Sequence, residues 1–353
     1  MNTLDDPALL ALDASGMLDH IAGLGAEFVN AWKSAAPLAT QVDTAAVRNV
    51  VIAGMGGSAA AGDYFSAVCA PSARVPITVV RDYGLPNYVS EESLVVLSTH
   101  SGETEETISC YDDAWKRGAA LAVITTGGVL AQRAQLDGVP LHRFVHRGSP
   151  RSALVHGLAP LLRIGSAAEW CVIEDTEVST AARRHRALVE QQFAPAIPLA
   201  RNPAKQAALK LHGRVVFVLG AEHLTAASRR FKNQIAETGK MLAAADELPE
   251  ADHNLIAGLG SAKPDAAYPA LVQLESPRYH ERTRHRCGLT AALFEDHGVP
   301  AVRMAADGAT LLGDLLQATA WSDFVSFYLA LLNGKDPTPI PEIRQVREAM
   351  AKG

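Results

Sequence analysis

The chain has 353 residues, and at roughly 150 residues per domain this length predicts two domains of similar size. Hydrophobic residues make up 48% of the sequence and charged residues 20%, which excludes a disordered chain of low hydrophobicity and high charge. The formal net charge of −6 gives no overall attraction to nucleic acid or to an anionic membrane. Any anion site must therefore be local.

The sequence is typical of a cytoplasmic protein. Its first six residues, Met-Asn-Thr-Leu-Asp-Asp, are acidic where a signal peptide would be basic. No apolar run approaches the roughly 20 residues that cross a bilayer, so we expect no membrane partner. The four cysteines lack a CxxC pair, which indicates buried, reduced thiols and no zinc knuckle: Cys69, Cys110, Cys171 and Cys287.

Residues 1–48 predict an N-terminal helical arm, because apolar residues recur at helical spacing from Leu18 to Trp32. Short apolar runs and helical stretches then alternate through a first α/β unit, residues 49–150. Runs that are apolar on both faces predict parallel strands covered by helices on each side. The expected strands are Val50–Ala53, Ile77–Val80, Leu94–Ser98, Ala120–Ile124 and Leu141–Val145.

Residues 151–195 predict a helical linker, and we interpret the Pro195–Pro203 stretch that follows as a linker too. A second α/β unit, residues 196–353, closes with a helix at Trp321–Leu332 and a last helix that begins after Thr338-Pro339. The predicted fold class is therefore α/β, with two αβα sandwich domains that each contain a mainly parallel sheet. The expected strands of the second unit are Val215–Leu219, Leu271–Leu274 and Val299–Met304.

Two loops that follow predicted strands have the residues of a phosphate site. Gly54-Met55-Gly56-Gly57-Ser58 leads into a helix, whose N-terminal N–H groups and partial positive charge suit an anion. In the second loop Thr99, Ser101 and Thr104 carry hydroxyl groups around Gly102, again before a helix. Hydroxyl groups that converge at a helix start suit a phosphate monoester.

Each loop has an alternative interpretation. The first could be a tight strand–helix turn without a ligand, and Ser101 or Thr104 could be a helix N-cap. Gly54-x-Gly56-x-x-Ala59 also fits a dinucleotide fingerprint and so a nicotinamide-dependent dehydrogenase. That fingerprint expects an acidic residue about 20 positions further on, whereas Asp82 lies 28 residues after Gly54.

Taken together, the GMGGS loop and Thr99-x-Ser-Gly-x-Thr-Glu-Glu-Thr resemble the sugar isomerase (SIS) domain, and more narrowly the bifunctional phosphoglucose/phosphomannose isomerase family. The resemblance covers nearly the whole chain. It implies two SIS domains, a homodimer, and the isomerisation of glucose 6-phosphate or mannose 6-phosphate to fructose 6-phosphate without metal or other cofactor. The further matching segments, in order, are Met17–Ile21, Pro150–Ala153, Arg230–Glu237, Glu247–Asn254 and Asp336–Pro339.

The resemblance also implies residue roles. Glu237 matches the base of the family, although its spacing from Arg229 and Asn233 alone favours a solvated helix face with an Arg–Glu pair. His253 matches the residue that opens the sugar ring, expected in the partner subunit's site, and Arg151 would stabilise an enediolate. The expected phosphate-binding residues are Gly56, Gly57, Ser58, Thr99, Ser101 and Thr104.

Three positions depart from the family pattern. Glu103 replaces the usual asparagine and would repel a phosphate unless it points outward, and Leu255 replaces a carboxylate. Arg347 aligns with the family's lysine, and an arginine keeps the charge without exchanging protons near neutral pH. These departures leave a second function open, that of a sugar-phosphate-binding regulator or assembly protein without turnover.

Two basic or histidine-containing segments are assigned no function. The Arg278–Arg286 stretch predicts a solvated loop or a subunit contact, because no aromatic platform for nucleic-acid bases accompanies it. His142 and His146 could share one strand face, but two histidines without a third ligand do not predict a zinc site. No metal and no nucleic acid are therefore expected.

Overall fold

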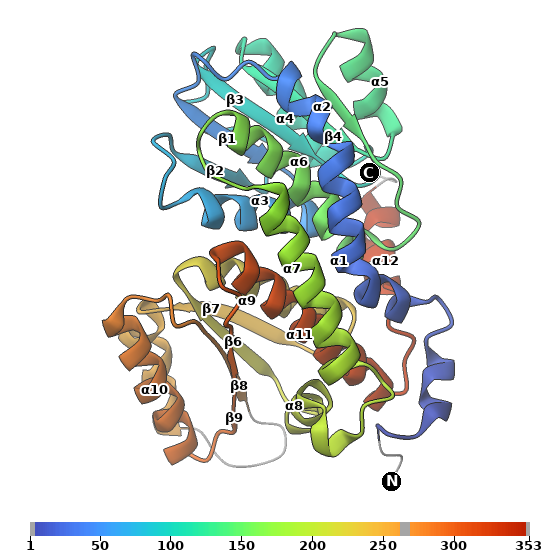
Figure 1. The fold of residues 1–353 in the computed structure, drawn as a ribbon, viewed down its shortest axis with the longest axis vertical. Coiled ribbons are helices and arrows are strands. Elements are labelled where there is room, and N and C mark those ends of the chain that lie inside the picture. Colours follow the sequence, from blue (N-terminus) through green and yellow to red (C-terminus); the bar gives the residue numbers. More distant parts are fainter. Residues whose placement is uncertain (1–3, 262–268, 351–353) are drawn as a thin grey trace.

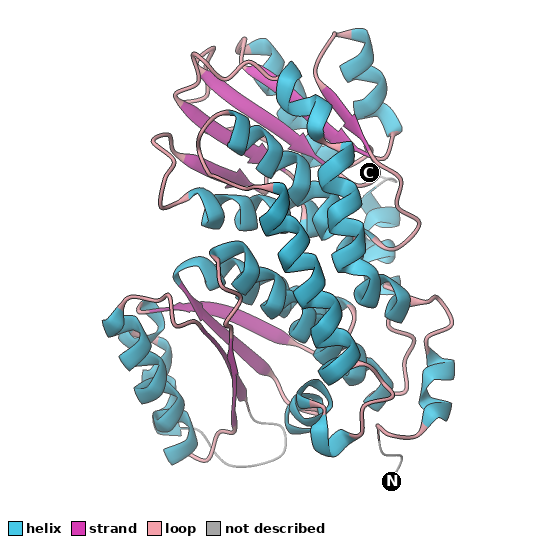
Figure 2. Cartoon of the chain, in the orientation of Figure 1, coloured by secondary structure: helices cyan, strands magenta, loops and turns pink. Residues whose placement is uncertain are grey.

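A computed structural model describes residues 4–261 and 269–350 and contains two parallel β-sheets with helices around them (Figures 1 and 2). The first sheet has the strand order β2-β1-β3-β4-β5, which confirms the predicted parallel arrangement of the first unit. Its strands are β1 (Asn49–Ala53), β2 (Ile77–Val80), β3 (Ser93–Ser98), β4 (Ala120–Thr125) and β5 (Leu141–Arg143). The strand predicted at Leu141–Val145 is thus two residues shorter.

Alternate residues of each central strand enter two separate hydrophobic clusters. Val50 and Ile52 of β1 pack with helices on one face of the sheet, and Val51 and Ala53 pack with helices on the other. This alternation is the reason that the strands are apolar at every position. The helices on the first face are α1 (Met17–Ser34), α3 (Gly56–Cys69) and α6 (Leu154–Ala167), and those on the second are α4 (Glu105–Lys116) and α5 (Gly128–Leu136).

The second sheet has the strand order β7-β6-β8-β9. The sequence analysis missed β7 (Ala243–Leu248), whose sequence AAADEL is rich in residues that are rare in strands. Its position at the sheet edge explains why a half-buried, polar segment can pair there. The other strands are β6 (Val216–Ala221), β8 (Ala270–Glu275) and β9 (Ala301–Ala305), and the flanking helices are α8 (Pro203–Leu211), α9 (Thr225–Glu237) and α10 (Glu281–Asp296).

Helix α11 (Leu311–Leu332) is the longest helix in the described part of the chain. With 22 residues and a mean hydropathy of 1.3 it is long and apolar enough to cross a membrane, so the expectation that no apolar stretch approaches this length was wrong. Its most apolar window is 89% buried, and it packs against α1, α3, α8 and α9. A helix that is apolar all round suits such a central position.

Helices α1 and α7 (Asp175–Leu188) lie side by side across both halves of the molecule (Figure 1). The Pro195–Pro203 segment is held in place, because the buried Asn202 caps α8 and donates hydrogen bonds to the carbonyl oxygens of Phe193 and Ala194. The remaining elements are α2 (Ala36–Gln41), α12 (Pro341–Met350), η1 (Pro7–Leu12), η2 (Pro150–Ser152), η3 (Val189–Phe193), η4 (Leu199–Arg201), η5 (Glu222–Leu224), η6 (Glu250–His253) and η7 (Leu255–Ser261).

The close contact of α1 with α7 depends on Gly25. A Cβ atom at Gly25 would lie 2.9 Å from the Ala182 carbonyl oxygen, whereas a Cβ at Gly23, on the same helix, meets nothing within 4 Å. We predict that Gly25→Ala lowers the free energy of unfolding by about 1–2 kcal/mol, since overpacking forces the helices apart. Gly23→Ala should leave it unchanged or raise it by up to about 1 kcal/mol. Denaturant unfolding of both variants is the measurement, and equal effects would contradict the prediction.

Candidate functional site

A cavity of about 220 Å³ lies where the two phosphate loops of the first unit face the end of α9 and the start of α12. Every site residue predicted from the sequence lines this cavity, with the exception of His253. Residues more than 200 positions apart are therefore brought together. The lining residues are Met55, Gly56, Gly57, Ser58, Thr99, His100, Ser101, Thr104, Pro150, Arg151, Glu237, Ile340, Ile343 and Arg347.

The first loop needs its glycines for close packing. A Cβ atom at Gly54 would lie 2.6 Å from the Ser98 carbonyl oxygen, and one at Gly57 would lie 2.8 Å from the Pro150 carbonyl oxygen. The loop thus touches both the end of β3 and the segment that carries Arg151. No side chain caps the N-terminus of α3, and whereas the Ser58 N–H donates to the Met55 carbonyl oxygen, those of Gly56 and Gly57 are left for an anion in the cavity.

The second loop presents hydroxyl groups and not a helix cap. Thr104 occupies the N-cap position of α4, but its Oγ1 lies 2.8 Å from Oγ1 of Thr99 and caps no helix N–H group. Ser101 Oγ accepts a hydrogen bond from the Glu103 N–H, 3.1 Å away. The interpretation of Ser101 or Thr104 as a helix cap is therefore wrong, and a second uncapped helix N-terminus faces the cavity.

Glu103 points away from the cavity. Its Oε1 accepts a hydrogen bond of 2.9 Å from the Val129 N–H in the first turn of α5. Gly102, with φ +76°, approaches this helix so closely that a Cβ would lie 1.9 Å from the Gly127 carbonyl oxygen. The carboxylate stabilises the α5 N-terminus and does not line the cavity, so the first departure from the family pattern does not obstruct an anion.

Arg151 is the buried cation of the cavity, with a side chain only 4% exposed. Its Nε donates to Thr238 Oγ1 at 3.0 Å, and its Nη2 donates to the carbonyl oxygens of Pro337 and Thr338 at 2.8 and 2.6 Å. Its Nη1 lies 3.6 Å from Glu237 Oε2 and has no hydrogen-bond partner in the described part of the chain. A buried donor without a partner is costly, so this nitrogen is placed to bind a ligand oxygen.

Glu237 ends α9, on the polar face that the spacing predicted. Phe231 and Ile235 on the opposite face are fully buried. Arg229 pairs with Glu247 on β7 at 3.8 Å, so the alternative of an Arg–Glu pair within the helix is not what forms. Glu237 also borders a second cavity of about 480 Å³, with Gly56, Ala60, Asp63, Arg81, Arg229, Arg230, Lys232 and Asn233.

The sequence analysis missed Lys240 and His100. Burial, together with the charge of Arg151, lowers the pKa of Lys240 to about 8, and its Nζ donates to the Glu237 carbonyl oxygen at 2.6 Å. His100 lines the cavity, and burial lowers its pKa. His100 could have been found from its place between Thr99 and Ser101, whereas nothing in the sequence near Lys240 marks it.

His253 does not line the cavity of its own chain. It lies exposed at the end of η6, and the preceding Asp252 accepts hydrogen bonds from Arg286 and Thr290 of α10 at 3.1 and 2.7 Å. Arg286, from the basic stretch Arg278–Arg286, thus forms an ion pair with Asp252. Arg347, on the exposed face of α12, reaches the cavity, and Leu255 packs against the hydrophobic core.

Comparison with known proteins agrees with this geometry. The bacterial phospho-glucose isomerase C-terminal SIS domain matches residues 200–350. The bifunctional phosphoglucose/phosphomannose isomerase of Caldicellulosiruptor bescii is 30% identical over 95% of this chain and 99% of its own, and that of Aquifex aeolicus is 28% identical over 88% and 92%. A hypothetical protein of Thermus thermophilus has a similar structure, with a TM-score of 0.77 at 16% identity over 98% of this chain and 92% of its own.

The fold and the phosphate loops define a protein of the sugar isomerase (SIS) class. The match to the relative from Caldicellulosiruptor bescii extends along nearly the full length of both chains. The chain belongs to the bifunctional phosphoglucose/phosphomannose isomerase family.

The hydroxyl groups of the second loop are predicted to bind the phosphate group of a sugar phosphate. The double variant Ser101→Ala/Thr104→Ala should bind a hexose 6-phosphate at least about tenfold more weakly, because hydrogen bonds to a charged group are worth about 1.5–3 kcal/mol. Ser109→Ala, farther along α4, is the matched control and should bind like the wild type. Isothermal titration calorimetry measures both, and unchanged binding in the double variant would remove the phosphate assignment.

Proposed function

We propose that this protein interconverts glucose 6-phosphate, mannose 6-phosphate or both with fructose 6-phosphate through a cis-enediolate, with Glu237 as the base. The observation that supports this most directly is the cavity, which has two uncapped helix N-termini and four hydroxyl groups on one side and a carboxylate–guanidinium pair on the other. The names of the relatives from Caldicellulosiruptor bescii and Aquifex aeolicus agree with it.

The phosphate group would bind first, to the N-termini of α3 and α4. Ser58, Thr99, Ser101 and Thr104 would hydrogen-bond its oxygens, and the helix dipoles favour its negative charge. This binding is remote from C1 and C2, and its free energy would position the reactive end of the open-chain sugar beside Glu237. An acidic protein could hold a dianion in this way because the positive potential is local.

Glu237 would then move one proton. Its carboxylate removes the C2 proton of the open-chain aldose, and the electrons form a C1–C2 double bond and shift to the oxygen at C1. The proton of the C2 hydroxyl group passes to the C1 oxygen, and Glu237 returns its proton to C1, which leaves a carbonyl group at C2. Arg151 Nη1, 3.6 Å from Glu237 Oε2, would donate a hydrogen bond to the oxygen on which negative charge develops. Arg151 thus supplies the positive charge that stabilises the enediolate, and we propose that the reaction requires no metal.

His253 and Arg347 complete the proposed site. Since His253 is exposed and lies outside the cavity of its own chain, we propose that it opens the sugar ring in the cavity of a partner subunit within a homodimer. Arg347, from α12, would contribute positive charge at the open side of the cavity. Lys240, whose pKa burial and the charge of Arg151 lower to about 8, lies close enough to Arg151 and Glu237 to feel both charges.

Replacement of the proposed base tests the reaction. Glu237→Gln keeps the shape of the side chain but cannot accept the proton, so turnover in a coupled assay should fall by at least about 10²-fold, while fructose 6-phosphate binding stays near that of the wild type. Glu247→Gln, which removes the partner of Arg229, is the control and should keep its turnover.

The same assay distinguishes the two candidate functions. EDTA-treated wild type should turn over glucose 6-phosphate or mannose 6-phosphate. Binding of the sugar phosphate without any turnover would refute the isomerase proposal and support a sugar-phosphate-binding regulator.

Mixed dimers test the shared site. Glu237→Gln and His253→Ala chains should each be inactive alone. A mixed dimer purified through two different affinity tags should regain activity, because one cavity then has an intact Glu237 and receives His253 from the other chain. Mixed dimers that stay inactive would show that His253 does not act across the interface.

A further inference from the structure

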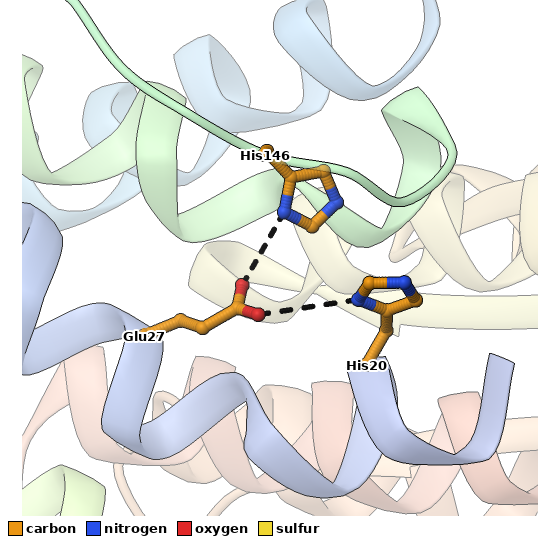
Figure 3. Close-up of side chains that lie close together, drawn as sticks. All are labelled: His20, Glu27 and His146. Atoms are coloured by element: carbon orange, nitrogen blue, oxygen red, sulfur yellow. Dashed lines mark ion pairs between the residues drawn. The ribbon is translucent and has the colours of Figure 1, made fainter. Parts of the chain in front are cut away.

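Three side chains outside the proposed active site converge on one point. His20, Glu27 and His146 place three potential ligand atoms within 4.8 Å of one another, and this is the one such group of His, Cys, Asp or Glu found among residues 4–261 and 269–350 (Figure 3). The side chains of His20 and Glu27 are half-buried, and that of His146 is buried. In the sequence His146 had no third metal ligand beside it. The fold supplies His20 and Glu27 from the distant helix α1.

The cluster joins segments that are far apart in the sequence. His20 and Glu27 are seven residues apart on α1 and therefore share one face, and His146 lies between β5 and η2. His20 Nδ1 lies 4.0 Å from Glu27 Oε1, and His146 Nδ1 lies 3.6 Å from Glu27 Oε2. His156 of α6 contacts the same carboxylate, with Nε2 at 3.3 Å from Oε2.

The protonation of His146 follows from its second ring nitrogen. Ser152 Oγ donates its one hydrogen to the Ser149 carbonyl oxygen at 2.8 Å, so it can only accept from His146 Nε2, 2.9 Å away. A neutral His146 thus carries its proton on Nε2 and directs the lone pair of Nδ1 at Glu27.

The Glu27 carboxylate is surrounded by three imidazole rings, those of His20, His146 and His156. Glu27 Oε2 faces the lone pair of His146 Nδ1 across 3.6 Å, with no proton between the two atoms. This arrangement is repulsive unless a cation lies between the two groups.

We propose that His20 Nδ1, Glu27 and His146 Nδ1 bind a divalent transition-metal ion of the zinc class. Zinc–nitrogen and zinc–oxygen bonds of about 2.0–2.1 Å separate tetrahedral ligand atoms by about 3.3 Å. The three ligand atoms lie within 4.8 Å of one another and reach that spacing by side-chain shifts of up to about 1.5 Å. Imidazole ligands select zinc and its neighbours over Mg²⁺ and Ca²⁺, which prefer oxygen ligands.

The surroundings have two further properties of a metal site. Ser152 holds the outer nitrogen of His146, and His156 holds the carboxylate of Glu27, which are the contacts that orient metal ligands in proteins. His20 and Glu27 are 25% and 28% exposed, so the ion can enter and keep a water molecule as its remaining ligand.

A metal at this position would stabilise the structure beside the active site. It would tie α1 to the segment ahead of Arg151, in which a Cβ atom at Gly148 would lie 2.6 Å from His146 Nε2 and 2.7 Å from His20 Nε2. Binding to the folded chain alone raises the unfolding temperature. The proposed metal site is separate from the cavity that contains Glu237, so metal binding there does not depend on the isomerase reaction.

The test is direct binding of Zn²⁺ to the untagged, chelator-treated protein in competition with a chromogenic chelator. The wild type should bind one Zn²⁺ per chain, unaffected by excess Mg²⁺, and its unfolding temperature should rise. Glu27→Gln and His146→Gln should bind at least about tenfold more weakly, since loss even of outer contacts costs about 10- to 100-fold in affinity.

Controls separate this site from adventitious binding and from misfolding. His285→Gln, on the exposed surface of α10, should bind Zn²⁺ like the wild type. His20→Gln removes a ligand that is partly exposed, so it tests the site if the variant of the buried His146 fails to fold. Wild-type affinity in Glu27→Gln or His20→Gln, or an equal loss in His285→Gln, would overturn the proposal.

Discussion

The candidate site depends on one buried guanidinium group. Arg151 is almost fully enclosed and is held by Thr238, Pro337 and Thr338, while a single nitrogen beside Glu237 is left without a partner in the described part of the chain. These contacts join the end of the first α/β unit to the end of α9 and to the segment that leads into α12. Because a buried charge must be compensated, the three parts of the chain are constrained to meet at the cavity.

A second network of buried polar side chains supports this arrangement. Arg230 of α9 forms a bidentate ion pair with Asp323 of α11, with hydrogen bonds of 2.7 and 3.0 Å. Gln234 donates to the same carboxylate at 2.6 Å. Arg230 also donates to the Arg151 carbonyl oxygen at 3.4 Å. The orientation of α9, and with it the position of Glu237, is thus coupled to the central helix and to the loop that carries Arg151.

Sequence patterns predicted the elements whose signals are local. The strands that are buried on both faces, and the apolar stripe of α1, were predicted correctly. In each case the order of apolar residues over a short segment shows which positions are buried. Strand β7 was missed because its pairing with β6, and not its composition, makes it a strand. The full length of α11 was missed because small and polar residues in its first half are buried only by the packing of distant helices.

The sequence by itself determined which chemical groups the two loops carry, since glycines, hydroxyl groups and helix starts lie next to one another in the chain. Only the tertiary structure decided what faces them. It placed Glu237 and Arg347 in their cavity, left His253 outside it, and directed Glu103 toward α5. The physical reason is that spacing along the chain specifies local geometry, whereas a contact across hundreds of residues depends on how whole elements pack.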